Sequence, residues 1–218
     1  MQILKKIIKY FYIPISMLIF VAVNADTRTQ ILQRNFQAMR LHGFQGVRAD
    51  KVVADMGITK GALYHHFSSK LDLGYAVVDE LLAPSYLSTW RPLETARKKH
   101  LQVLVQTLEQ FKQRTDDEEV KLGCPLNNLM QEMSPLDEGF RRRLGNIIEK
   151  MAYSIETGLR NGQAASTIRP DADAKQLAVF ILSCIEGSYS VAKSVQSKAY
   201  FDSSIDQLIT FVNGLAAK

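Results

Sequence analysis

The chain has 218 residues, 46% of them hydrophobic and 22% charged, with a formal net charge of +5. This composition excludes a disordered chain and supports a sizeable core in one large or two small globular domains. Its two cysteines, Cys124 and Cys184, are too few and too far apart to indicate a disulfide framework or a zinc site, so a reducing compartment is expected.

Residues 1–25 do not share the pattern of the rest of the chain. They contain Lys5, Lys6, Lys9 and no acid, and an uncharged, mostly apolar run follows from Phe11 to Val23. This arrangement resembles a secretory signal peptide, and the apolar run is short for a comfortable membrane-spanning helix.

A first helix is expected at residues 27–42, because apolar residues recur at helical spacing and Gly43 follows. The next stretch predicts two short helices joined by a tight turn. The first is expected at residues 49–56. Gly57 suits the left-handed residue that closes a helix, and Thr59 is placed to cap the second helix.

The second short helix, residues 60–67, has two distinct faces. Leu63 and Phe67 lie four residues apart and can hold the helix by packing, which a helix of barely two turns needs for stability. The opposite face carries Lys60, Tyr64 and His65. A short helix with a basic, hydroxyl-bearing outer face and a bracing helix before it is typical of a helix-turn-helix.

Positive charge is concentrated around this motif. Residues 26–71 contain seven basic and three acidic side chains, a balance of +4. This distribution is the electrostatic footprint of a DNA-binding head on a nearly neutral body, although a solvated surface could carry the same charge.

Many positions within residues 27–75 together resemble the N-terminal domain of the TetR family of bacterial repressors. The matching positions are Gly43, Phe44, residues 57–64, Phe67, Lys70 and Leu71. One position departs from the family pattern. Arg48 stands where the family usually has Ser or Thr, so it can contact a phosphate but cannot cap the first helix of the motif. Asp50 would partly compensate through the helix dipole.

The resemblance also implies which side chains meet DNA. Lys60, Gly61 and Ala62 match positions that face base edges, and Tyr64 and Lys70 match positions that hold phosphates. The complete candidate DNA-binding set is Arg48, Thr59, Lys60, Gly61, Ala62, Tyr64, His65 and Lys70.

Helical periodicity continues to the end of the chain. Residues 70–90 are expected as one helix kinked by Pro84, and Pro92 is expected to mark a break. Pro125 suits a first helical position, with Cys124 as the cap. The other expected helices are residues 95–114, 137–162, 171–196 and 201–215, with a loop at 115–119.

The resemblance implies that the last two long helices form a homodimer interface as a four-helix bundle. The small residues Ser183, Gly187 and Ser188 would permit close approach there, and intramolecular packing is the alternative reading. A small-molecule effector is expected among the middle helices. The candidate effector-binding residues are Trp90, Phe111, Asn127, Met130, Gln131, Tyr153, Glu186 and Tyr189. Core packing is the alternative for the apolar members, whereas Glu186 lies in an apolar stripe and needs a partner.

The sequence therefore predicts an all-α fold, with a three-helix DNA-binding domain at residues 26–75 and a larger helical effector-binding and dimerisation domain at 76–218. The expected function is a transcriptional regulator: a repressor released from a palindromic double-stranded DNA operator by a small molecule. The sequence contains no recognised catalytic motif or metal-binding pattern, so no enzyme activity, cofactor or metal is expected.

Two alternatives stay open. The chain could be a helical small-molecule-binding protein whose helix-turn-helix no longer binds DNA. It could also be a repressor that senses oxidants or electrophiles through Cys124, since a thiol at a helix N-terminus can have a lowered pKa; structural burial is the competing role for Cys124. A cytoplasmic location without stable membrane association is expected, with residues 1–25 outside the fold and translation starting near Val23, which GUG can encode.

Overall fold

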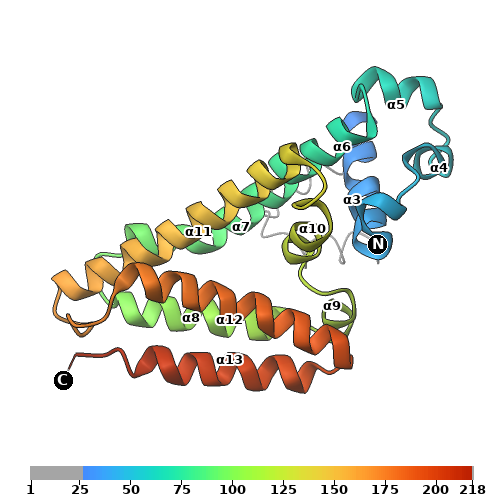
Figure 1. The fold of residues 1–218 in the computed structure, drawn as a ribbon. Helices are drawn as coiled ribbons and strands as arrows, with labels where there is room; N and C mark the ends of the chain where they lie inside the picture. The colour runs from blue at the N-terminus through green and yellow to red at the C-terminus, as the bar shows by residue number, and fades with distance from the viewer. Residues whose placement is uncertain (1–26, 218) are drawn as a thin grey trace. The chain divides into compact units, whose positions relative to one another are not determined.

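The computed structural model describes residues 27–217. Within this range the secondary structure is helical, apart from an isolated antiparallel bridge between Ile168 and Ala216, so the expected all-α fold is confirmed. The chain divides into two compact units, each made of two segments (Figure 1). We call residues 27–85 with 131–143 the head unit, and residues 86–130 with 144–217 the body unit. The expectations for residues 1–25 lie outside the described residues.

The head unit begins with helices α3 (Thr27–Gly46), α4 (Ala49–Ala54), α5 (Lys60–His66) and α6 (Lys70–Ala76). Gly43 interrupts α3 as predicted, with a φ of 70°, although helical turns resume as far as Gly46. Gly57 has a φ of 72°, so the predicted left-handed residue after α4 is confirmed. The head core contains Ile31, Leu32, Phe36, Met39, Val53, Leu63, Phe67 and Leu73, each at most 5% exposed.

A π-helical segment ends just before Pro84, where the sequence predicts a kink. This segment, η1 (Val77–Leu82), separates α6 from α7 (Ala83–Thr95). Proline offers no N–H, and its ring crowds the carbonyl four residues earlier. The wider turns of a π-helix directly before Pro84 accommodate both effects.

Pro92 does not interrupt the helix, so the break expected at this residue was wrong. Helix α7 continues through Pro92 to Thr95. Trp90 and Leu93 on either side are at most 1% exposed, so their packing holds the helix together despite one missing hydrogen bond. Leu93 packs close to Gly158, where an added Cβ would lie 3.0 Å from the Leu93 Cβ.

Residues distant in sequence complete the head unit. The carboxylate of Glu132 accepts hydrogen bonds from the backbone N–H groups of Phe44 and Gln45, both at 2.8 Å. The Phe140 ring packs edge-on against Phe44, with ring centroids 4.7 Å apart, and against Tyr75 at 5.1 Å. The head core is therefore built from two separate stretches of chain.

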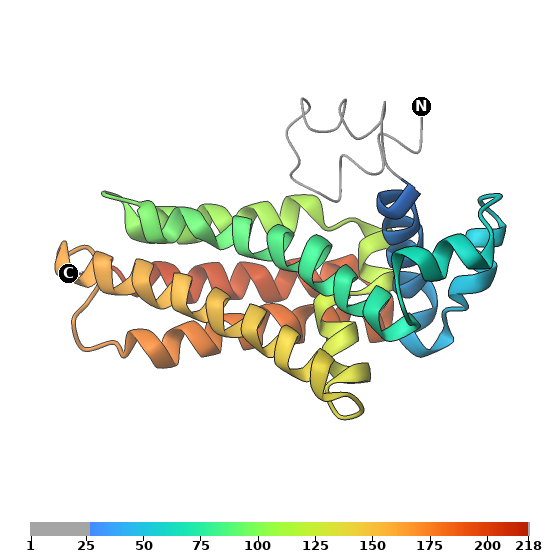
Figure 2. The same ribbon diagram turned by 90° about the horizontal axis from the view of Figure 1, so that it is seen from above.

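The body unit is a bundle of longer helices. Its remaining elements are α8 (His100–Arg114), α9 (Asp117–Leu122), α10 (Pro125–Met133), α11 (Glu138–Ala164), α12 (Ala174–Val195) and α13 (Lys198–Asn213). Helix α13 packs against both α8 and α12, and the three helices lie side by side in both views of the ribbon (Figures 1 and 2). Helices α7, α10 and α11 each have residues in both units.

The prediction of a loop at residues 115–119 is partly wrong, because residues 117–119 form the first turn of α9. The side chain of Asp116 caps this helix by accepting a hydrogen bond from the backbone N–H of Glu119 at 2.9 Å. Three acids in the first turn also favour a helix N-terminus. Val120, 1% exposed, anchors the short helix in the core.

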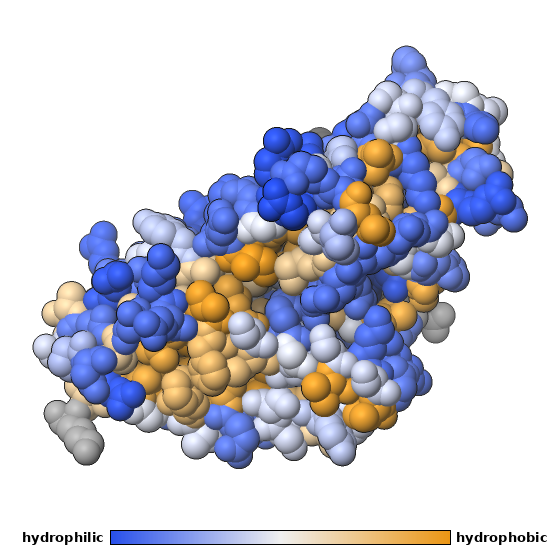
Figure 3. All heavy atoms as spheres, viewed as in Figure 1, coloured by the Kyte–Doolittle hydropathy of each residue, from blue (hydrophilic) through white to orange (hydrophobic). Residues whose placement is uncertain are grey.

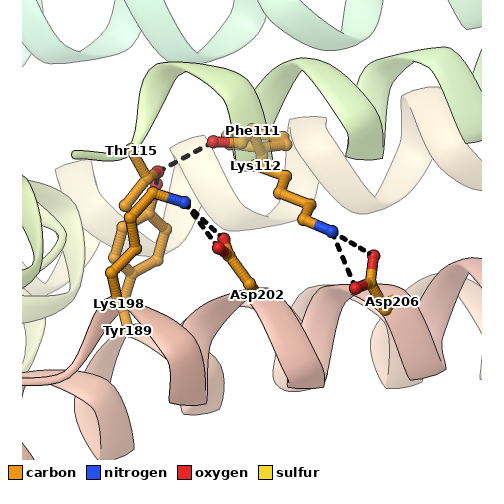
Figure 4. Close-up of polar contacts among 7 residues, drawn as sticks. All are labelled: Phe111, Lys112, Thr115, Tyr189, Lys198, Asp202 and Asp206. Atoms are coloured by element: carbon orange, nitrogen blue, oxygen red, sulfur yellow. Dashed lines mark hydrogen bonds and ion pairs between the residues drawn. The ribbon is translucent and has the colours of Figure 1, made fainter.

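Polar contacts tie α8 to the last two helices (Figure 4). The Lys112 amine donates to both carboxylate oxygens of Asp206 at 2.7 Å, and this hydrogen bond raises the pKa of Lys112. The Thr115 hydroxyl donates to the Phe111 carbonyl and lies 2.9 Å from the Tyr189 hydroxyl. Side chains from three helices therefore meet at the end of α8.

Replacing Gly74 with alanine is expected to destabilise the head unit. An added Cβ would lie 2.5 Å from Phe44 Cε2 and 2.6 Å from Phe140 Cζ, two buried rings. Overpacking of this kind costs about 1–3 kcal/mol. Urea unfolding followed by circular dichroism measures the change. Gly61→Ala is the matched control, because its nearest neighbour would be Thr59 Oγ1 at 3.8 Å. Equal stability of the two variants would contradict the packing described at Gly74.

Candidate functional site

Helix α5 presents one face to the head core and the other to solvent. Leu63 and Phe67 are 2% and 4% exposed, so the predicted packing face is confirmed. The predicted cap is confirmed too, since the Thr59 Oγ1 accepts a hydrogen bond from the Ala62 N–H at 3.1 Å. The outer face carries the exposed residues Lys60, Gly61, Tyr64 and His65, with Ala62 half-buried.

The amine of Lys60 lies 5.8 Å from the centroid of the Tyr64 ring. This cation–π contact aligns two of the exposed side chains along α5. A short helix with an exposed glycine, a lysine and a phenol on one face has the groups that contact DNA: donors for base edges and phosphates, and room for close backbone approach.

Arg48 precedes α4 and Lys70 begins α6, and their side chains lie in different environments. Arg48 makes no cap for α4, as expected, and its guanidinium pairs with the Asp50 carboxylate at 3.5 Å. The Lys70 amine donates to the Gln45 carbonyl at 3.0 Å and lies 4.9 Å from the Phe44 ring centroid. Partial burial lowers the pKa of Lys70, and the nearby Glu132 carboxylate opposes this shift.

A second group of candidate residues meets inside the body unit. The Tyr86 hydroxyl lies 3.1 Å from the Cys124 Sγ, and the Asn127 side-chain amide donates to the Glu186 carbonyl at 3.1 Å. The Glu186 carboxyl interacts with Cys124, and the Glu186 charge acts on Tyr189, three residues later on α12. We call these five residues, Tyr86, Cys124, Asn127, Glu186 and Tyr189, the polar cluster.

Burial sets the protonation of the polar cluster. It raises the pKa of Glu186 to about 7. It also raises the pKa of Cys124 well above its ordinary value, and the pKa values of Tyr86 and Tyr189 likewise. At neutral pH the thiol and both phenols are therefore neutral, and Glu186 is divided between its acid and carboxylate forms.

Two buried polar atoms of the body unit lack a hydrogen-bond partner among the described residues: Glu186 Oε2 in the polar cluster, and Trp90 Nε1, one helical turn after Tyr86 on α7. Trp90 packs against Phe111 with ring centroids 5.7 Å apart. Unpaired polar atoms at buried positions cost stability, so they mark places where a ligand can supply the missing partner.

The structure does not bring every predicted effector residue into this region. Tyr153 is 63% exposed on α11, and Gln131 is an exposed residue of the head unit. Met130 is half-buried in α10. Sequence reasoning missed Tyr86, although it lies one helical turn before Trp90 and therefore on the same face of α7.

The environment of Cys124 is that of a structural residue. Its thiol does occupy the predicted cap position, accepting from the Asn127 N–H at 3.5 Å. The residue is 3% exposed, however, and its pKa moves upward, opposite to the shift that creates a reactive thiolate. The thiol-sensing alternative is therefore not favoured.

Two protein-family models match the chain. "Bacterial regulatory proteins, tetR family" matches residues 31–77, and "Tetracyclin repressor-like, C-terminal domain" matches residues 101–208. The first includes the helix-turn-helix and the second includes most of the body unit.

Relatives and solved structures agree with these matches. The HTH-type transcriptional repressor DhaR of Mycobacterium sp. is 24% identical over 185 residues, which cover 85% of this chain and 89% of DhaR. The HTH-type transcriptional repressor NemR of Escherichia coli is 28% identical over 144 residues, which cover 62% of this chain and 70% of NemR. A TetR transcriptional regulator from Chloroflexus aurantiacus has the same fold, with a TM-score of 0.76, 23% identity, and coverage of 87% of this chain and 96% of that chain. The reduced form of Escherichia coli NemR also has this fold, with a TM-score of 0.77 and 20% identity. The match covers 88% of this chain and 97% of that chain.

Cys124 is expected to react slowly with electrophiles in the folded protein. In a Cys184→Ser variant Cys124 is the remaining thiol of the chain. Because it is buried and protonated, alkylation by iodoacetamide at about pH 8 should be at least about tenfold slower in buffer than in urea. Mass spectrometry at timed intervals measures both rates. Alkylation in buffer as fast as in urea would revive the sensor alternative.

Proposed function

Since the chain belongs to the TetR family of bacterial transcription regulators and is a DNA-binding repressor by that membership, we propose that it acts as a homodimer released from a palindromic operator by a small-molecule effector. The observation that carries this proposal is the outer face of α5, capped by Thr59 and left free by the packing of Leu63 and Phe67. This proposal assigns the protein to the cytoplasm, where its DNA lies.

The outer face of α5 supports a role in reading the major groove. Lys60, Gly61 and Ala62 occupy the first turn, the part of a recognition helix that meets base edges. Tyr64 follows one turn later and can reach a phosphate, as can Arg48 at the start of α4. Lys70 can join them only if its amine leaves the Gln45 carbonyl or bridges both acceptors.

An unpartnered apolar face on the body unit supports the dimer. On α12 the exposed residues include Val179, Phe180, Val191 and Val195, and Phe180 packs edge-on against Phe211 of α13, which is 39% exposed. Figure 3 shows hydrophobic side chains gathered over α12. A face of this kind on the last two helices fits a four-helix interface between two copies.

The small residues on α12 divide between the two sides of the helix. Ser183 and Gly187 are exposed, and an added Cβ at Gly187 would meet open space, which suits close approach by a partner helix. Ser188 is 6% exposed and donates to the Cys184 carbonyl, so it belongs to the body core rather than to this face. By length and composition α12 could cross a membrane, but eight of its residues pack inward.

Effector release needs a link from the body unit to the head unit. Helices α10 and α11 supply one, because their residues 131–143 belong to the head, where Glu132 and Phe140 contact Phe44. A ligand that binds one arrangement of these helices better than another would shift the head between DNA-binding and released states.

Lysine substitutions test the DNA contacts. We expect Lys70→Ala to weaken binding to all sequences similarly and to lower the salt slope by about one, as loss of a phosphate contact does. Lys60→Ala should instead reduce discrimination between sequences, by about 1–3 kcal/mol. Fluorescence anisotropy on operator and scrambled DNA at several salt concentrations measures both quantities.

The exposed Lys121 on α9 provides the control, and Lys121→Ala should change neither quantity. If Lys70→Ala leaves the salt slope unchanged, Lys70 does not hold a phosphate. If Lys60→Ala weakens specific and non-specific binding equally, α5 does not read bases at that position.

A charge placed on the apolar face should separate the dimer. Val191 is 51% exposed, and Val191→Glu would bury two related carboxylates near the two-fold axis of the proposed interface. We expect a folded monomer at micromolar concentration by analytical ultracentrifugation. Leu136→Glu, at an exposed leucine of the head unit, is the matched control. An unaffected dimer in the Val191 variant would show that the subunits associate elsewhere.

A further inference from the structure

Glu186 is an acid without a counter-charge. Its Oε2 is buried and has no hydrogen-bond partner among the described residues, although the residue as a whole is half-buried. No lysine or arginine contributes to its pKa, which responds to burial and to a hydrogen bond with Cys124. Buried carboxylates are ordinarily paired, so the structure leaves one partner unsupplied.

The groups facing Glu186 cannot supply a positive charge. They are Tyr86 from α7, Cys124 at the start of α10 and Tyr189 on α12, and burial keeps all three neutral at ordinary pH. Lys193, further along α12, donates to the Asn128 side chain at 3.0 Å. A cation that pairs with the carboxylate form of Glu186 would therefore come from outside this set of residues.

Aromatic rings pack in pairs on the helices that carry these residues. Tyr86 and Trp90 lie one turn apart on α7, Trp90 packs against Phe111, and the Tyr189 ring packs against Phe201 at 4.5 Å. Ring faces attract cations, and the attraction strengthens when water is excluded. An acid beside the Tyr86 and Tyr189 rings combines the two features that select a cation with an apolar body.

We propose that the polar cluster is the effector subsite, and that it takes a lipophilic organic cation whose ammonium group pairs with the Glu186 carboxylate while its apolar body packs against Trp90 and Phe111. The proposal rests on the proposed function in treating the body unit as the effector domain. It adds the chemical class of the effector and the residue that selects it.

Proton release follows from the pairing. Without ligand, a group with a pKa of about 7 is partly protonated at neutral pH. A bound cation stabilises the carboxylate and lowers that pKa, so binding expels the proton from the protonated fraction. Affinity should therefore fall as pH drops below about 7 and level off above it, since the facing thiol and phenols stay neutral throughout.

A set of three ligands with one apolar body tests the charge requirement. The full-length protein, without DNA, is titrated calorimetrically with 4-phenylbutylamine, 4-phenylbutanol and 4-phenylbutyrate. We expect the amine to bind at least about tenfold tighter than the alcohol and the carboxylate to bind most weakly. For the amine, titrations in buffers of different ionisation enthalpy should show proton release near pH 7.

Glu186→Gln removes the charge and keeps the shape. We expect it to weaken amine binding at least about tenfold and to abolish proton release, while Glu149→Gln, at an exposed acid of α11, changes neither. Should Glu186→Gln not fold, the order of the three ligands and the pH profile of the unaltered protein still decide the question.

The proposal is overturned if the alcohol or the carboxylate binds as tightly as the amine, if amine affinity does not fall below pH 7, or if the amine shows no binding at about 1 mM. Operator binding is measured separately on the same preparation. Loss of operator binding with intact amine binding would contradict the proposed function alone, and the reverse result would contradict the cation site alone.

Discussion

Two hydrogen bonds, from the backbone N–H groups of Phe44 and Gln45 to the Glu132 carboxylate, join the two segments of chain that form the DNA-binding head. They satisfy two backbone N–H groups at the point where Gly43 interrupts α3, and an added Cβ at Gly43 would lie 2.9 Å from Glu132 Oε2. Lys70 then closes the same turn by donating to the Gln45 carbonyl. The segment leading into the helix-turn-helix is thus fixed by a residue 87 positions further along the chain.

The Glu132 hydrogen bonds suggest how effector binding in the body unit could be coupled to DNA binding by the head unit. Glu132 lies at the end of α10, and the polar cluster includes Cys124 and Asn127 at the beginning of the same helix. A ligand that pairs with Glu186 would act where Asn127 contacts α12. A shift of α10 would move the Glu132 carboxylate relative to the Phe44 and Gln45 N–H groups. Losing its acceptor would be costly for the Phe44 N–H in particular, because that hydrogen bond is partly buried.

Local features were readable from the sequence and distant ones were not. Gly57, the Thr59 cap and the Leu63–Phe67 packing face were predicted because each depends on residues within one or two helical turns. The continuity of α7 through Pro92 depends on buried packing of Trp90 and Leu93, and the completion of the head by Glu132 and Phe140 depends on contacts across the sequence. The helical periodicity of apolar residues predicts neither the continuity of α7 nor the contribution of Glu132 and Phe140 to the head. Glu186 was suspected from its apolar surroundings, but Tyr86 emerged only from the structure.

Selection of bound sequences from a random double-stranded DNA library tests the central claim, that α5 reads a palindromic operator, most directly. The account predicts enrichment of an inverted repeat with half-sites about one helical turn apart, bound specifically with a Kd of about 10⁻⁸ M or tighter. It also predicts that Lys60→Ala alters the preferred bases within each half-site. Enrichment of no sequence, or of one unchanged by Lys60→Ala, would contradict it.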